Sequence, residues 1–261
     1  AGATSYTTTS STVSFNGTSG AQNIPGFSFN NLTINNTSGV TLTDNISVTG
    51  AANALTFTNG KITTGSSYTI TLSATTTSST AAAGKYIFGN QARIIASGTT
   101  SNAFYVGDAT NYTPATIDFT GVTNSVGTLT VNTTGSDETN INTSGLIPTK
   151  TVNRFWTLAA SGITPATPTY GTTLTFINPG DLDGGTTPAN FIIKRYSSGW
   201  NSTTVGTWTS TTTQATGIVG FGNLQIGEAC TAPSINTPVV NNITCNGSTD
   251  GSIDITTTGG T

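Results

Sequence analysis

Histidine and methionine are absent from this chain, and only 17 of its 261 residues are charged. Without histidine there is no Ser-His-Asp or Cys-His nucleophile, no imidazole metal ligand and no side chain with an ordinary pKa near neutrality. The net charge of −3 excludes an electrostatic footprint for nucleic acid. No apolar run approaches the ~18 residues of a helical membrane span. These absences favour a structural, non-enzymatic chain.

Four residue types, Thr, Gly, Ser and Asn, supply 143 of the 261 residues. The chain nevertheless differs from a disordered one, because Thr, Val and Ile are abundant and 21 aromatic residues are spread along it. Thr is β-branched and suits the outer face of a strand while apolar neighbours fill the inner face. No stretch shows a 3.6-residue apolar period. We therefore predict an all-β protein, and its length favours two domains over one.

An internal repeat occupies the first third of the chain. Residues 13–16 (VSFN), 32–35 (LTIN) and 55–58 (LTFT) share one alternating pattern, at offsets of 19 and 23 residues. A second alignment places 27–29 (FSF) against 46–48 (ISV), and it continues to 68–70 (YTI). Short strands that recur about every 20 residues predict a parallel β-solenoid, in which like residues stack from coil to coil. An antiparallel meander is the alternative, although hairpins would not require constant offsets.

The pattern changes after the repeat. Residues 74–80 (ATTTSST) are expected to form an exposed loop, and longer alternating strands typical of a β-sandwich follow from 112 to 228. The expected sandwich strands are 115–119, 128–132, 152–158, 172–177, 191–196, 206–210, 215–219 and 224–226. We expect Trp156 and Phe155 to anchor this second core, with Phe176, Phe191 and Phe221 facing them.

The C-terminal segment carries the first of two resemblances. After an extended linker at 232–238, residues 242–261 resemble the opening of a SprB repeat, a module of the large surface adhesins of gliding Bacteroidetes. The matching elements, in order, are Cys-Asn-Gly at 245–247, Asp-Gly-Ser-Ile at 250–253 and Thr-Gly-Gly-Thr at 258–261. The second half of that repeat does not follow. The expected domains are thus a solenoid at 1–111, a sandwich at 112–229, and at 230–261 a linker with the truncated start of an Ig-like β-module.

The second resemblance covers residues 25–228, which are similar to a region common in large secreted proteins of the same bacteria. The residues that carry it are 30–35, 58–62, 106–108, 112–115, 153–156, 190–196 and 226–228. The resemblance implies export by the type 9 secretion system, display at the cell surface, and a role in adhesion, gliding motility or filament building. A C-terminal sorting domain would then lie beyond residue 261.

Asp181 and Asp183 are the candidate metal ligands, because two carboxylates two residues apart before glycines suit oxygen ligation of Ca²⁺. The alternative is an ordinary turn in which Asp accepts backbone hydrogen bonds, since no third acidic ligand follows. The adjacent pair Asp137–Glu138 is expected in a solvated loop. Lys194–Arg195 is expected on an exposed strand face.

Cys230 and Cys245 are the only cysteines. A disulfide between them would tie the last sandwich strand to the next module, and an oxidising extracellular setting would permit it. Cys245 could instead pair with a cysteine beyond residue 261.

Two functional hypotheses follow. The first is a structural and adhesive segment of a long cell-surface or filament protein, whose partners are other copies, neighbouring modules or surface glycans. The second is a carbohydrate-binding module that uses exposed Trp200, Trp208 or Tyr196. A catalytic lyase groove is disfavoured, because residues 1–80 contain only Asp44 and Lys61 as charged side chains.

Overall fold

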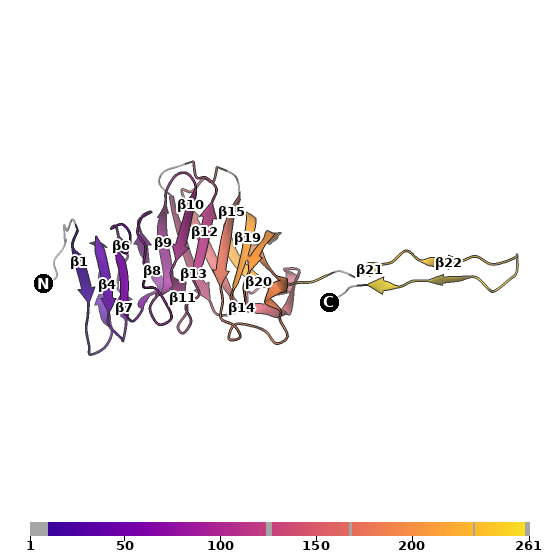
Figure 1. The fold of residues 1–261 in the computed structure, drawn as a ribbon, viewed down its shortest axis with the longest axis horizontal. Helices are drawn as coiled ribbons and strands as arrows, with labels where there is room; N and C mark the ends of the chain where they lie inside the picture. Colours follow the sequence, from indigo (N-terminus) through magenta and orange to yellow (C-terminus); the bar gives the residue numbers. More distant parts are fainter. Residues whose placement is uncertain (1–9, 124–126, 167–168, 232, 259–261) are drawn as a thin grey trace.

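The computed structural model describes residues 10–123, 127–166, 169–231 and 233–258 of the chain. It is all-β, with 55% strand and 2% helical content, and it contains a solenoid-like region of about 5 turns beside separate antiparallel sheets. Figure 1 shows the solenoid at the N-terminal end, the sandwich in the middle and a long hairpin at the C-terminal end. The predicted fold class is confirmed.

The first solenoid sheet is parallel and contains β1 (Thr12–Phe15), β4 (Asn31–Asn35) and β7 (Leu55–Asn59). Val13 pairs with Leu32, and Leu32 pairs with Leu55. These pairings confirm the offsets of 19 and 23 residues predicted from the repeat. Apolar side chains stack inward along the solenoid, while the alternate polar side chains form outward rows.

The other solenoid faces are formed by β2 (Gln22–Ile24), β3 (Ser28–Phe29), β5 (Val40–Leu42), β6 (Ile46–Val48) and β8 (Ile62–Leu72). The pairing of Ser28 with Ser47 is as predicted. The last alignment was wrong by two residues, because Ile46 pairs with Ile70 and not with Tyr68. Side chains alternate with a period of two, so a two-residue slip keeps an apolar residue on the inner face. Both isoleucines are accordingly buried.

The expectation of an exposed loop at 74–80 holds only in part, because Thr75, Thr77 and Ser79 are exposed while Thr76 and Ser78 are buried. Thr76 is fully buried, and its hydroxyl lies 3.1 Å from the carbonyl oxygen of Val48. Arg93 donates a hydrogen bond from Nη1 to the carbonyl of Thr76 at 2.7 Å. A polar side chain of this loop therefore satisfies a backbone carbonyl of the preceding coil, and its neighbours on either side remain exposed.

One sheet runs from the solenoid into the sandwich. β9 (Ile87–Ile95) pairs in parallel with β8 on one side and antiparallel with β13 (Gly127–Thr134) on the other. The short β11 (Val106–Gly107) also pairs with β9. The sheet continues through β14 (Leu146–Ser161), β20 (Gly222–Ala229), β16 (Phe191–Tyr196) and β17 (Trp200–Ser202). The predicted domain boundary at 111/112 stays a prediction, because β9 and β13, which lie on either side of it in the sequence, pair within this one sheet.

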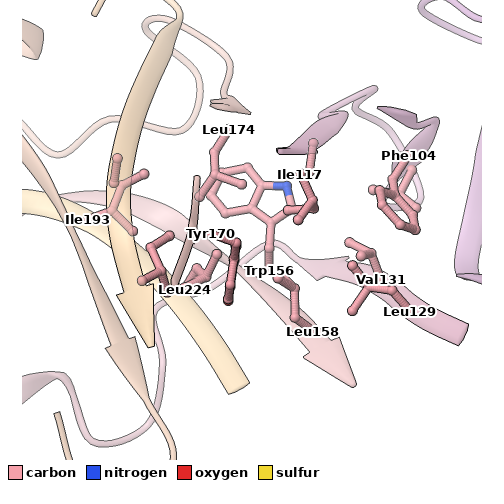
Figure 2. Close-up of a cluster of buried hydrophobic side chains, with 14 of the residues drawn as sticks. Phe104, Ile117, Leu129, Val131, Trp156, Leu158, Tyr170, Leu174, Ile193 and Leu224 are labelled. Atoms are coloured by element: carbon pink, nitrogen blue, oxygen red, sulfur yellow. The ribbon is translucent and has the colours of Figure 1, made fainter. Parts of the chain in front are cut away.

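The second sandwich sheet is antiparallel. In spatial order it contains β10 (Thr100–Phe104), β12 (Ala115–Phe119), β15 (Thr169–Thr175), β19 (Thr212–Val219) and β18 (Thr204–Trp208). Two short 3-10 helices, η1 (Ile141–Thr143) and η2 (Pro188–Asn190), lie in the connections. The apolar core contains side chains from both sheets, and Figure 2 shows Trp156 at its centre beside Ile117 and Leu174.

Trp156 is fully buried and donates its indole N–H to the carbonyl of Thr113 at 3.0 Å. Phe176 and Phe191 are also in this core, and their rings meet edge to face with centroids 5.6 Å apart. Phe155 was wrongly expected to share the core with Trp156. It is only half-buried, because neighbouring residues of a strand point to opposite faces of the sheet.

The C-terminal segment 234–258 is a long hairpin, which we call the arm. Its outgoing half contains β21 (Ser234–Ile235) and β22 (Val239–Asn241), and its returning half contains β23 (Ser252–Asp254) and β24 (Thr257–Thr258). β21 pairs with β24, and β22 pairs with β23, both antiparallel. The arm extends away from the sandwich in Figure 1, and its apolar side chains, Ile253 among them, are exposed.

Candidate functional site

The two predicted metal ligands lie in the β15–β16 connection, where each is hydrogen-bonded to strand β14. Arg154 of β14 donates from Nε and Nη2 to the two carboxylate oxygens of Asp181, at 3.0 and 2.9 Å. The same Nη2 contacts Oδ2 of Asp108 at 2.6 Å. The Arg154 side chain is 1% exposed, so these are charge-assisted bonds in a poorly solvated environment. We call Asp108, Arg154 and Asp181 the Arg154 cluster.

A second polar group surrounds Thr151 on the same strand. The Thr151 hydroxyl lies 2.7 Å from Oδ1 of Asp137 and 3.1 Å from Oδ2 of Asp183. One hydroxyl proton serves only one of these two carboxylates at a time. The Nε2 of Gln225, a fully buried residue of β20, donates to Asp137 Oδ1 at 3.0 Å. We call these four residues the Thr151 cluster.

The carboxylates predicted to bind Ca²⁺ are thus engaged in separate internal clusters. Asp181 accepts from Arg154 and from the backbone N–H of Ile177 at 2.8 Å. Asp183 accepts from the backbone N–H of Thr151 at 2.9 Å and from the side-chain amide of Asn153 at 3.0 Å. Within the described ranges, no group of three or more His, Cys, Asp or Glu side chains could hold a metal ion. The Ca²⁺ site stays a prediction, and the bonding corresponds to its alternative, a structural turn.

Two expectations about exposed charges were wrong. Glu138 is buried, and its backbone N–H donates to Oε1 of Gln225 at 2.9 Å, so the 137–138 pair is not in a solvated loop. Arg195 is also buried, and it donates from Nη1 to the carbonyl of Phe221 at 2.9 Å. Its neighbour Lys194 is on the opposite face of β16, where its Nζ contacts Ser202. Charged residues are scarce in this chain, and the sandwich uses several of them to satisfy internal carbonyls and amides.

One carboxyl of each cluster has a shifted pKa, and the two shifts are in opposite directions. Burial alone would raise the pKa of Asp108, but backbone N–H bonds from Thr110 and Asn111, together with the Arg154 charge, outweigh burial and lower it. Burial raises the pKa of Asp137, and the nearby charge of Asp183 adds to that effect against the hydrogen bonds from its neighbours. Asp108 and Asp137 therefore contribute to stability with opposite dependence on pH.

The two cysteines are exposed, and no disulfide joins them in this structure. Cys230 follows β20, and its backbone N–H donates to the carbonyl of Gly145 at 2.9 Å. Cys245 lies in the connection between β22 and β23, so β21 and β22 separate the two cysteines along the chain. The Sγ of Cys245 lies 3.0 Å from Oγ of Ser248. A bond between them would require the arm to fold back, and the disulfide stays a prediction.

The aromatic residues considered for carbohydrate binding differ in exposure. Trp200 is half-buried against Tyr196, with ring centroids 5.2 Å apart, and its indole N–H donates to the carbonyl of Asn140. Trp208, on β18 at the edge of its sheet, is 51% exposed. Of the three predicted residues, only Trp208 therefore presents a largely accessible aromatic surface.

The outer faces of the solenoid carry polar side chains in register. Ser14, Thr33 and Thr56 occupy neighbouring positions across β1, β4 and β7. Beside them, Asn59 donates from its side-chain amide to Oδ1 of Asn35 at 2.8 Å. These rows offer hydroxyl and amide groups at the ~4.8 Å strand spacing of a β-sheet.

Comparisons with protein families, curated proteins and solved structures find no match for this chain. In the part of the chain that the structure describes, neither short helix has the length or apolar character to cross a membrane.

Proposed function

We propose that this chain is a non-enzymatic structural and adhesive segment of a long extracellular or cell-surface protein. The observation that carries the proposal is the continuous sheet from β2 to β17, which we call the main sheet. It connects the solenoid to the sandwich through β8 and β9. Hydrogen-bonded strands in a shared sheet resist separation collectively, so tension applied along the chain would be distributed over many bonds. The resemblances of 25–228 and 242–261 add the expectation of type 9 secretion and of adhesion or gliding.

The adhesive part of the proposal is assigned to the outward polar rows of the solenoid. Rows such as Ser14, Thr33 and Thr56 present uncharged donors and acceptors with regular spacing. Such groups can hydrogen-bond to the hydroxyls of a polysaccharide without the long-range attraction or repulsion of charged surfaces. The partner proposed here is therefore a neutral surface glycan.

The test uses beads coated with the chain in a flow chamber whose surface carries a neutral polysaccharide. We expect beads to be retained under flow, and a Thr33→Lys, Thr56→Lys variant to lose most retention because bulky charges interrupt the central row. Thr139→Lys, in a loop of the sandwich, is the matched control and should retain binding. Equal retention of all three coatings would contradict the assignment of adhesion to this face.

A carbohydrate-binding sandwich is the second candidate, and the exposure of Trp208 favours it. An exposed indole can stack on the apolar face of a sugar ring. A glycan array distinguishes the candidates, because Trp208→Ala would abolish binding in this second case and leave it unchanged in the first.

A further inference from the structure

Strand β1 is the first strand of the solenoid that the structure describes. β1 pairs with β4 on one side, and no strand in the described part of the chain pairs with its other side. Beside this edge an apolar pocket of about 410 Å³ is lined by Thr12, Val13, Phe15, Pro25, Phe27 and Phe29. Unpaired edges with apolar side chains favour the addition of a further strand.

The arm has complementary properties. Ile253 pairs directly with Val240, so these two side chains are on one face of the hairpin. They are 68% and 56% exposed, and Ile255 is 58% exposed. A two-stranded hairpin with this much exposed apolar surface is marginally stable alone, so contact with another sheet would stabilise it.

The sequence of the arm repeats the pattern of the stacked solenoid strands. Residues 252–256 read Ser-Ile-Asp-Ile-Thr, residues 12–16 read Thr-Val-Ser-Phe-Asn, and residues 31–35 read Asn-Leu-Thr-Ile-Asn. A strand laid on β1 in the same register would place Ile253 beside Val13, and Ile255 beside Phe15. It would thereby continue the interface that β1 makes with β4 and that β4 makes with β7.

Charge does not oppose this contact. Residues 10–43 contain no charged side chain, and residues 233–258 contain only Asp250 and Asp254. In the shared register Asp254 would lie beside Ser14, on the outer face. Because the arm and β1 are at opposite ends of the molecule in Figure 1, one chain cannot make this contact with itself.

We propose that the arm of one copy adds as a parallel strand to β1 of a second copy, so that the chains assemble head to tail. The inference rests on the proposed structural function and names its partner, a second copy of this chain. The contact joins two different surfaces, so it is heterologous and leaves a free arm and a free end on every assembly. Repetition of the contact produces an open filament.

The experiment measures the mass of the full chain in solution by light scattering over a rising concentration series. We expect concentration-dependent dimers and higher assemblies. An arm variant (Ile253→Asp, Ile255→Asp) and an end variant (Val13→Asp) should each be monomeric, with folding of the sandwich verified by near-ultraviolet circular dichroism. A 1:1 mixture should form heterodimers and nothing larger, because it contains one intact arm–end pair.

The register is tested at an exposed position where folding is not disturbed. Ser14→Asp places a second carboxylate beside Asp254 and should raise the concentration of half-assembly about twofold to fivefold, whereas Ser14→Lys should lower it by a similar factor. Ser19→Asp, in an exposed turn, is the charge-matched control and should have no effect.

Three results would overturn the proposal. These are a monomer at every concentration, self-association of the arm variant through two solenoid ends, and self-association of the end variant through two arms. None of them would affect bead retention on a polysaccharide, so failure of the assembly and failure of the adhesive function are distinguishable.

Discussion

Arg154 donates to both carboxylate oxygens of Asp181, and neither residue is more than 6% exposed at its side chain. The pair connects β14 of the main sheet to the β15–β16 connection, 27 residues later. Asp108, which follows β11, joins the same guanidinium at 2.6 Å. One arginine therefore fastens two connections of the sandwich to a central strand.

Asp181→Asn should destabilise the sandwich by about 3–5 kcal/mol, because removing one partner of a buried ion pair leaves the other charge poorly compensated. Asparagine keeps the size of the side chain, so packing is preserved and the lost charge is isolated. Urea unfolding followed by Trp fluorescence measures the change. Asp254→Asn, on the exposed arm, is the matched control and should stay within about 0.5 kcal/mol of the parent. A similar small change for Asp181→Asn would show that Asp108 alone compensates Arg154.

The contributions of Asp137 and Asp108 to stability should depend on pH with opposite sign. Asp137 has a raised pKa in the folded state, so its contribution is fully present below the ordinary value of 3.8 and is lost as pH rises through the folded pKa. An asparagine side chain at this position cannot ionise. The stability of Asp137→Asn relative to the parent should therefore increase as pH rises from about 4 toward neutrality.

Asp108→Asn provides the comparison of opposite sign. The lowered folded pKa of Asp108 gives a contribution that is present above 3.8 and is lost as pH falls through the folded pKa. Its relative stability should thus fall as pH rises. Thermal unfolding of all three proteins across a pH series gives both difference curves. Parallel curves for the two variants would contradict the assignment of opposite shifts.

The repeat made the solenoid predictable from the sequence, because stacking places like residues at constant offsets. Leu32 and Leu55 pair as predicted. The failure at Ile46 arises within β8, where the pairing with β9 shifts register between Gly65 and Thr69. Two extra residues in such an irregularity leave the alternation of apolar and polar positions unchanged. The pattern of apolar positions therefore cannot reveal an alignment error of two residues.

The polar clusters could not be predicted in the same way. Arg154 is 46 residues from Asp108 and 27 from Asp181, and no spacing rule relates residues on different strands of a sandwich. The Asp181-Leu182-Asp183 motif indicated a local site, yet its two carboxylates bond to different partners on β14. Asp181 accepts from Arg154, and Asp183 accepts from Thr151 and Asn153. The sequence did contain one signal, which is the small number of charged residues. An arginine that lies between apolar positions on one face of a strand is expected to be buried, and a buried charge requires a partner.

Trp156 should dominate the energetics of the sandwich core. Trp156→Ala should cost about 3–5 kcal/mol, because it removes a large buried side chain and leaves a cavity between the two sheets. Trp156→Phe should cost less but remain measurable, since the carbonyl of Thr113 loses its donor. Trp208→Ala is the matched control, and its 51% exposure predicts a change within about 0.5 kcal/mol. Chemical denaturation distinguishes these cases, and equal losses at both tryptophans would contradict the core described here.

Gly60 should be indispensable to coil stacking, whereas Gly84 should tolerate substitution better. Both have left-handed backbones, with φ of +81° and +75°, so alanine carries a conformational cost of about 1–2 kcal/mol at either position. At Gly60 a Cβ would also overlap the carbonyl oxygen of Asn36 in the preceding coil, while at Gly84 it would meet no atom within 4 Å. Gly60→Ala should therefore destabilise the solenoid by more than Gly84→Ala does. Hydrogen exchange of the β4 and β7 amides reports this region separately from the sandwich, and faster exchange should appear only in Gly60→Ala. Unchanged protection in that variant would mean that the turn moves away from Asn36 without disturbing the stack.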